Sequence, residues 1–199
     1  MENNQLIAQL NWFYSLEQSQ VKLYTAQSKW FAKRYSGIVF ERIAIIEQQH
    51  VDNIAAKIRE IGGTPTFLGD LIAPLFGRLA GNISAQTGLN GVLSLNIALE
   101  QKAMQDYNKL ISRLRQENPD SAETIRLLQH NFVDEHLHTE WFRNKLIASK
   151  QYDFTVKQRN LFGRKYSVSV SDCVAHARAP RRPVKLSKWL DKQAAVRNR

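Results

Sequence analysis

The chain has 199 residues and one cysteine, Cys173, which excludes a disulfide framework and an all-cysteine zinc, iron–sulfur or rubredoxin-type iron site. Its net charge of +10 is uneven: residues 1–150 carry 16 Lys and Arg against 15 Asp and Glu, whereas residues 151–199 carry 12 against 3. We therefore predict a near-neutral folded domain over 1–150 and a basic, flexible tail over 151–199. Because neither a signal peptide nor an apolar membrane span is visible, we expect a cytoplasmic protein.

Residues 3–35 predict a first long helix. Apolar residues recur there at spacings of three and four, which places them on one face of an α-helix. Glu17 falls on this apolar face, where a carboxylate is costly unless it has a partner. Gly37 predicts the break after this helix.

Residues 38–61 predict a second helix, which the pair Gly62-Gly63 should end. Its apolar face is formed mainly by isoleucines. Glu47 and His50 lie on that same face, one helical turn apart. A metal ion would serve as partner to both side chains.

Residues 62–90 form a connection rich in glycine and apolar residues, interrupted by Pro74. A short kinked helix would gather Leu71, Ile72, Leu75, Phe76 and Leu79 on one face. Two interpretations are open for this stretch. It is a connector that crosses the bundle and covers its end, or residues 71–83 form a patch that touches the membrane surface or admits an apolar substrate.

Residues 89–116 and 121–148 predict the third and fourth helices. Glu100 lies on the apolar face of the third helix, and Glu135 and His138 lie on the apolar face of the fourth. After residue 150 no period is sustained. The basic tail is predicted to be loosely packed, with attraction to an anionic membrane or to nucleic acid as the alternative, and nucleic acid is not favoured.

The two halves of the chain share one design. Each has a lone glutamate followed, 30 residues (17 to 47) or 35 residues (100 to 135) later, by a Glu-x-x-His pair. Each lone glutamate is followed by a tyrosine seven residues on, two turns along the same helix face. Residues three apart lie about 5–6 Å from each other, so a carboxylate and an imidazole can reach one metal ion. The predicted ligands are Glu17, Glu47, His50, Glu100, Glu135 and His138, and the two tyrosines are Tyr24 and Tyr107.

This pattern predicts an all-α four-helix bundle with a long crossover between helices 2 and 3. It resembles the ferritin-like di-iron carboxylate proteins, in which Glu and Glu-x-x-His ligands project into the bundle core. The resemblance implies two iron ions cycling between Fe2+ and Fe3+, with manganese as the alternative. Glu47 and Glu135 would bridge the two ions, Glu17 and Glu100 would each cap one, and the histidines would supply one nitrogen to each.

Within that class, residues 10–145 are similar to the demethoxyubiquinone hydroxylase family of ubiquinone synthesis. The features that carry the similarity are Glu17 with Tyr24, Pro65-Thr66 fifteen residues after His50, the stretch PLFGRLAGNISAQTG, ALE100 with Tyr107-Asn108, and DEHLH around Glu135. The resemblance implies a monooxygenase that acts on an apolar quinone precursor.

Three functions are therefore open: this monooxygenase, a peroxide- or oxygen-scavenging or iron-oxidising protein of the rubrerythrin type, and a metal-free helical scaffold tethered by its tail. Tyr24 and Tyr107 are candidate catalytic residues that would bond ligands or relay electrons, or else they are buried structural tyrosines. The expected partners are an apolar substrate or peroxide and O2, an unidentified electron donor, the membrane surface at 71–83, and a second copy in a homodimer.

Overall fold

The computed structural model describes residues 1–75, 88–118 and 121–161, with 152–161 described by their backbone alone. The chain divides into two compact units, Met1–Asp153 and Phe154–Arg199, and the first contains the bundle and the site. The long helices are α1 (Asn3–Trp30), α2 (Tyr35–Glu60), α4 (Leu89–Glu117) and α5 (Ala122–Leu161), with a further helical segment over 69–75.

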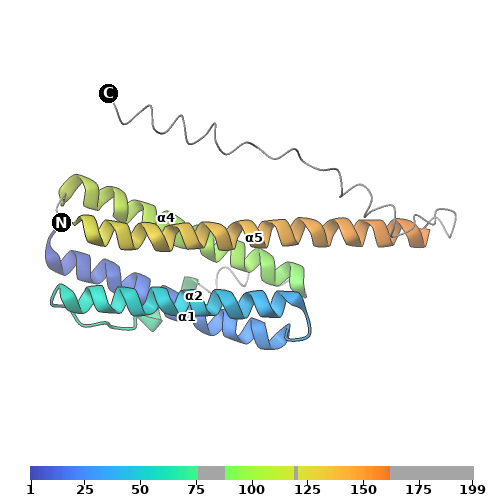
Figure 1. Cartoon of the computed structure of the whole chain (residues 1–199), viewed down its shortest axis with the longest axis horizontal. Coiled ribbons are helices and arrows are strands. Elements are labelled where there is room, and N and C mark those ends of the chain that lie inside the picture. The colour runs from blue at the N-terminus through green and yellow to red at the C-terminus, as the bar shows by residue number, and fades with distance from the viewer. Residues whose placement is uncertain (76–87, 119–120, 162–199) are drawn as a thin grey trace, which may run out of the picture. The chain divides into compact units, whose positions relative to one another are not determined.

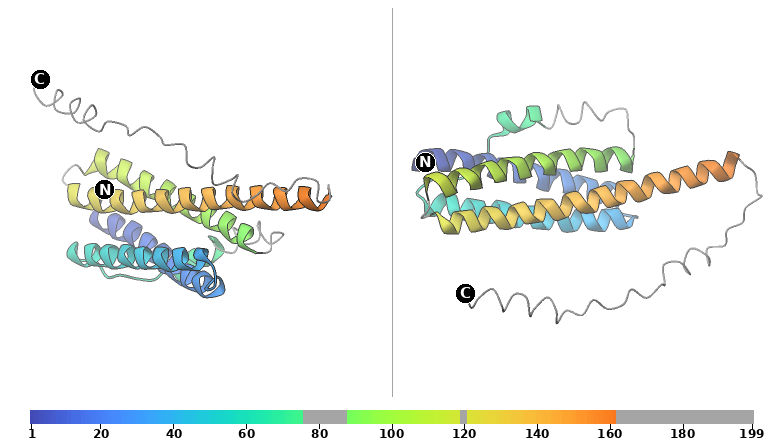
Figure 2. Two further views of the ribbon diagram at one scale, coloured as in Figure 1. Left: turned by 45° about the vertical axis from the view of Figure 1, so that its right-hand side comes forward. Right: turned by 90° about the horizontal axis from the view of Figure 1, so that it is seen from above.

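The four long helices form a bundle of two antiparallel hairpins. α1 and α2 make one hairpin, and α4 and α5 make the other (Figure 1). α2 and α4 run in the same direction, so the connection between them must return along the length of the bundle (Figure 2). The predicted all-α fold with a long crossover after the second helix is confirmed.

The turn between α1 and α2 lies earlier than predicted. α1 ends at Trp30, and Gly37 stands inside the first turn of α2 instead of marking the break. A Cβ atom at Gly37 would lie 2.3 Å from the carbonyl oxygen of Phe31. Glycine is therefore needed there because the backbone of the turn packs directly against the start of α2.

The end of α2 follows the prediction. Gly62 has a φ of +82°, a left-handed conformation that favours glycine. Its N–H donates to the carbonyl of Arg59 (3.0 Å), and the N–H of Gly63 donates to the carbonyl of Ile58 (2.8 Å). These two bonds close the helix as a Schellman motif.

The fourth long helix is longer than predicted. α5 continues to Leu161, so 151–161, which we predicted as tail, are helical. The sequence between 122 and 161 contains neither glycine nor proline, and a helical backbone can therefore continue after the apolar period fades. The rest of the predicted tail, 162–199, lies outside the described residues, and its division from 1–150 stays a prediction.

The connection after α2 lies against α1. The side chain of Asn11 donates to the carbonyl of Thr64 (3.2 Å) and accepts from the N–H of Thr66 (2.7 Å). The hydroxyl of Ser15 accepts from the N–H of Leu68 (2.8 Å). Two buried polar side chains of α1 thus satisfy backbone groups of a segment without regular structure.

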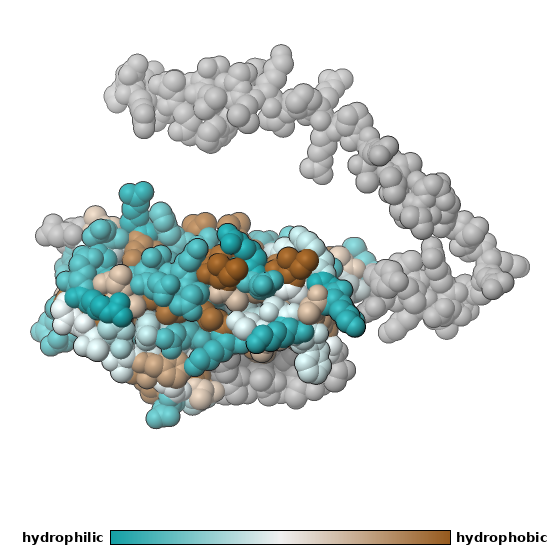
Figure 3. All heavy atoms as spheres, turned by 60° about the horizontal axis from the view of Figure 1, so that its bottom comes forward, coloured by the Kyte–Doolittle hydropathy of each residue, from teal (hydrophilic) through white to brown (hydrophobic). Residues whose placement is uncertain are grey.

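Only residues 71–75 of the predicted apolar patch at 71–83 are described. Leu71 is 61% exposed, whereas Ile72 is 1% exposed and packs in the core, so these two do not share one exposed face. Residues 76–83, including Phe76 and Leu79, lie outside the described residues. No helix among the described residues is long and apolar enough to cross a membrane. On the face drawn in Figure 3, exposed apolar side chains are scattered among hydrophilic ones.

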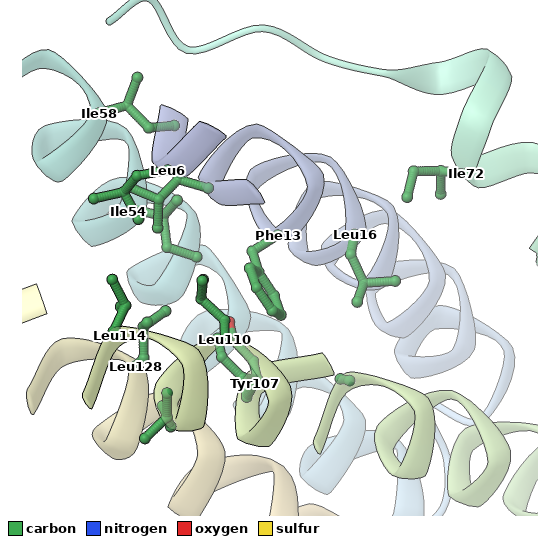
Figure 4. Packing of buried hydrophobic residues seen from close by; sticks show 13 residues of the cluster. Leu6, Phe13, Leu16, Ile54, Ile58, Ile72, Tyr107, Leu110, Leu114 and Leu128 are labelled. Atoms are coloured by element: carbon green, nitrogen blue, oxygen red, sulfur yellow. The ribbon is translucent and has the colours of Figure 1, made fainter. Parts of the chain in front are cut away.

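Two apolar clusters occupy the bundle interior. One contains Phe13, Leu16, Ile54, Leu110 and Leu128 among others (Figure 4). The second is formed mainly by aromatic residues of the other half of the bundle: Tyr24, Phe31, Phe40 and Phe142. Burying each of these large side chains contributes roughly 1.5–3 kcal/mol. Along every long helix the predicted ligand residues fall between residues of the two clusters, so the core is interrupted by a polar layer.

Candidate metal centre

The polar layer brings together all six predicted ligand residues. The four glutamates are fully buried, and His50 and His138 are 2% and 5% exposed. Their potential ligand atoms fall into two groups, and within each group all atoms lie within 4.8 Å of one another. The first group is Glu17, Glu47, His50 and Glu135, and the second is Glu47, Glu100, Glu135 and His138.

Glu47 and Glu135 belong to both groups, a position from which each carboxylate could bridge two ions. The spacing of three within each Glu-x-x-His pair places both side chains on the inner face of α2 or α5. His50 Nδ1 lies 3.1 Å from Glu47 Oε2 and 3.2 Å from Glu135 Oε1. His138 Nδ1 lies 3.2 Å from Glu47 Oε1 and 3.5 Å from Glu135 Oε2. Each imidazole therefore faces both shared carboxylates through Nδ1.

The two predicted tyrosines hold the lone glutamates across the bundle. The Tyr24 hydroxyl donates to Glu100 Oε1, and the Tyr107 hydroxyl donates to Glu17 Oε1. Each half of the repeat thus positions the carboxylate of the other half. Tyr107 also stacks on Phe13, with ring centroids 4.1 Å apart.

Sequence reasoning missed three polar residues that support the site. Gln20 Nε2 donates to Glu100 Oε2 (2.8 Å), Asn131 Nδ2 donates to the Tyr107 hydroxyl (3.1 Å), and Asp134 Oδ2 lies 3.1 Å from His50 Nε2. Gln20 lies one turn after Glu17, and Asn131 one turn before Glu135. Gln20 and Asn131 could have been predicted from the sequence, because each is a polar residue one helical turn from a ligand on the inner face.

Two other histidines do not join the site. His130 and His136, which the sequence left open as surface residues or supports of the ligands, are exposed on α5.

The two lone glutamates, Glu17 and Glu100, lie in an environment that disfavours their negative charge. Burial, and then the neighbouring carboxylate of Glu135, raise the pKa of both Glu17 and Glu100 well above the usual range. Burial alone would lower the pKa of His138, but the adjacent carboxylates of Glu135 and Glu47 outweigh burial and raise that pKa to about 10. The pKa of Glu135 shifts in the opposite direction: burial alone would raise it, but the neighbouring side chains of Glu100, His138 and His50 lower it on balance.

The donor set fits metal ions. Six buried ligand atoms lack a hydrogen-bond partner among the described residues: Glu17 Oε2, Glu47 Oε1, both carboxylate oxygens of Glu135 and both ring nitrogens of His138. Buried polar atoms are normally satisfied, and leaving them unpaired is costly. One cation within each group would satisfy the inward-facing atoms, and mixed carboxylate and imidazole ligands suit divalent transition metals.

The shifted pKa values predict how the stability of metal-free protein depends on pH. A histidine with a pKa of about 6.5 when unfolded and about 10 when folded adds stability that is complete below pH 6.5 and is lost as the pH rises through 10. The raised pKa values of Glu17 and Glu100 also lower the stability of the folded state as the pH rises above 4.5. Between pH 6.5 and 10, the loss from His138 should be about 1.4 kcal/mol of unfolding free energy per pH unit.

Denaturant unfolding of chelator-treated protein at pH 6.5, 8 and 9.5 measures this loss. The variant His138→Gln should show a shallower decline than the unmodified chain. A free energy of unfolding that stays constant or increases over this range would contradict the expectation.

The fold and site together define a helical-bundle protein with a paired carboxylate–histidine cluster at its centre. A family model described as the ferritin-like domain matches residues 7–150, which contain all six cluster residues. The chain belongs to the ferritin-like domain family. The ferritin-like part of the sequence resemblance is confirmed, whereas its di-iron content and the narrower resemblance to the demethoxyubiquinone hydroxylases stay predictions.

Solved structures show the same fold. One is the bacterioferritin of Desulfovibrio desulfuricans, described as having a diiron site studied in different catalytic states. It is 18% identical to this chain, with a TM-score of 0.62, and the alignment covers 75% of this chain and 82% of the bacterioferritin. No functionally curated protein sequence matches the chain.

Proposed function

We propose that this chain is a di-iron carboxylate oxidoreductase that reduces O2 or peroxide. The observation that carries the proposal is the division of six buried side chains into two ligand groups that share Glu47 and Glu135. Two ions held in this way would lie on either side of the shared carboxylates. Four carboxylates and two neutral imidazoles balance two divalent ions, which removes the cost of burying the carboxylates.

Iron is the metal that the proposal favours. The bacterioferritin of similar fold has a diiron site, and carboxylate with imidazole suits iron as well as manganese. When bound, two ferrous ions supply two electrons, enough to reduce O2 to hydrogen peroxide or hydrogen peroxide to water.

The side chains of this protein would organise that chemistry. Tyr24 and Tyr107 fix the orientation of Glu100 and Glu17 through their hydroxyls, which leaves the second oxygen of Glu17 directed at the cluster. Both phenols are fully buried. Burial and the adjacent carboxylates raise their pKa values, so each keeps its proton and remains a donor. We assign them a positioning role.

A quinone-precursor monooxygenase is the second candidate, supported by the resemblance of residues 10–145. One motif of that resemblance, Pro65-Thr66, lies in the segment that Asn11 and Ser15 hold against α1. An apolar substrate would enter past residues 71–83 in this proposal. The bacterioferritin of similar fold, described as having a diiron site that was reduced and allowed to reoxidise, favours oxidation of ferrous ion as the reaction instead.

One experiment separates these functions. Purified chain is loaded anaerobically with Fe2+, bound iron is counted, and the protein is mixed with O2 or hydrogen peroxide while oxidant consumption and iron oxidation are followed. We expect about two Fe2+ per chain and rapid oxidation of both. A short-chain demethoxyubiquinone analogue with a chemical reductant is then added and the product is analysed.

Each outcome favours a different function. Hydroxylated analogue in proportion to O2 consumed would establish the monooxygenase, and oxidant consumption without hydroxylation would favour the scavenging or iron-oxidising function. A folded chain that binds no iron would exclude both and leave the helical scaffold.

A further inference from the structure

The two ligand groups are not equivalent, although the two halves of the chain repeat one design. Both histidines face the shared carboxylates through Nδ1, which leaves Nε2 pointing away. The Nε2 of His50 meets Asp134 at 3.1 Å. The Nε2 of His138 is buried and has no hydrogen-bond partner among the residues that the structure describes.

The two halves of the repeat differ in the residue that precedes the shared glutamate. Asp134 directly precedes Glu135 in the second half, whereas Ile46 directly precedes Glu47 in the first. Asp134 comes from α5 and serves the histidine of α2. Ile46 occupies the corresponding position on α2 and has no polar atom to offer in return. One imidazole is therefore fixed in orientation and tautomer by a carboxylate, and the other is not.

The two lone glutamates, Glu17 and Glu100, also differ in the hydrogen bonds that they accept. Both oxygens of Glu100 already accept hydrogen bonds, from the Tyr24 hydroxyl and from Gln20 Nε2. Among the described residues Glu17 accepts one hydrogen bond, at Oε1 from Tyr107, and its Oε2, which has no partner there, lies 3.9 Å from His50 Nδ1. An ion at the second position meets two Glu100 oxygens that each already accept a hydrogen bond, whereas an ion at the first position meets Glu17 Oε2, for which the described residues supply none.

We propose that the two metal positions have unequal affinity: the position formed by Glu17 and His50 binds its ion more tightly, and Asp134 is the positioning residue responsible. A carboxylate that orients a metal-binding histidine typically contributes 10–100-fold to metal affinity. This inference rests on the proposed dinuclear centre. It adds that one ion is held firmly and the other exchanges.

The test is anaerobic titration of the full chain with Co2+, followed by visible absorption and calorimetry. We expect two separate steps, the first 10–100-fold tighter than the second. Asp134→Asn should weaken the first step by this factor and leave the second unchanged. Asp52→Asn, a carboxylate on α2 that bonds Gln48 instead of a histidine, is the matched control and should change neither step.

Two further variants assign the steps to positions. Glu17→Gln should remove the tight step and Glu100→Gln the weak one, with circular dichroism confirming that each variant is folded. Two ions binding in one indistinguishable step, an unchanged first step in Asp134→Asn, or loss of the tight step in Glu100→Gln would each overturn the inference. A folded chain that binds no Co2+ or Fe2+ at all would instead overturn the dinuclear centre itself.

Discussion

Replacing Glu135 by glutamine is expected to abolish the binding of both metal ions. Glu135 and Glu47 are the two residues that belong to both ligand groups, and both oxygens of Glu135 are buried and unpaired. An amide keeps the shape of the carboxylate but removes the negative charge that each ion needs. Metal analysis after Fe2+ loading should therefore fall from about two ions per chain to less than one.

The matched comparison uses glutamates with one role or none. Glu100→Gln removes a residue of one group only and should leave about one ion per chain. Glu140→Gln changes an exposed glutamate of α5 that pairs with Arg143, and should keep both ions. If Glu135→Gln retained two ions, Glu135 would not be shared between them.

Metal loading is expected to stabilise the fold strongly. Without ions, six buried ligand atoms have no partner in the described part of the chain, and the carboxylates lie close to one another, which opposes folding. Ligand that binds only the folded state adds about 4 kcal/mol when its concentration is 1,000 times the dissociation constant. For a chain of this length that corresponds to a rise in Tm of roughly 8–16 °C.

Thermal unfolding with and without Co2+ or Zn2+, which avoid oxidation by air, measures this rise. Chelator should return the Tm to the metal-free value. The Glu135→Gln variant should show little response to metal, which separates specific loading from general effects of divalent ions. An unmodified chain whose Tm does not change with metal would contradict the expectation.

Much of the fold and the cluster could be predicted because one periodicity carries both. A helix repeats every 3.6 residues, so the same stripe that identified the apolar faces also placed Glu17, Glu100 and the Glu-x-x-His pairs in the core. A buried carboxylate needs a partner, and six such ligands in four helices limit the arrangement. The geometry of the two groups then followed the sequence closely.

The features that escaped prediction depend on contacts between distant segments. Asp134 had no predicted role, because its contact is with His50, 84 residues away along the chain. Gly37 predicted a helix break because glycine interrupts helices. In the structure it lies within α2, where its lack of a side chain makes room for the carbonyl of Phe31. The length of α5 was underestimated because the end of an apolar stripe does not end a helix.

Each ligand group draws on both hairpins, since the first takes Glu17 from α1 and Glu135 from α5 while the second takes Glu47 from α2 and Glu100 from α4. An isolated hairpin consequently offers a nascent chain no complete coordination sphere. Metal binding must then follow the docking of the two hairpins. Bound metal would stabilise the assembled bundle but would not direct the folding of either hairpin alone.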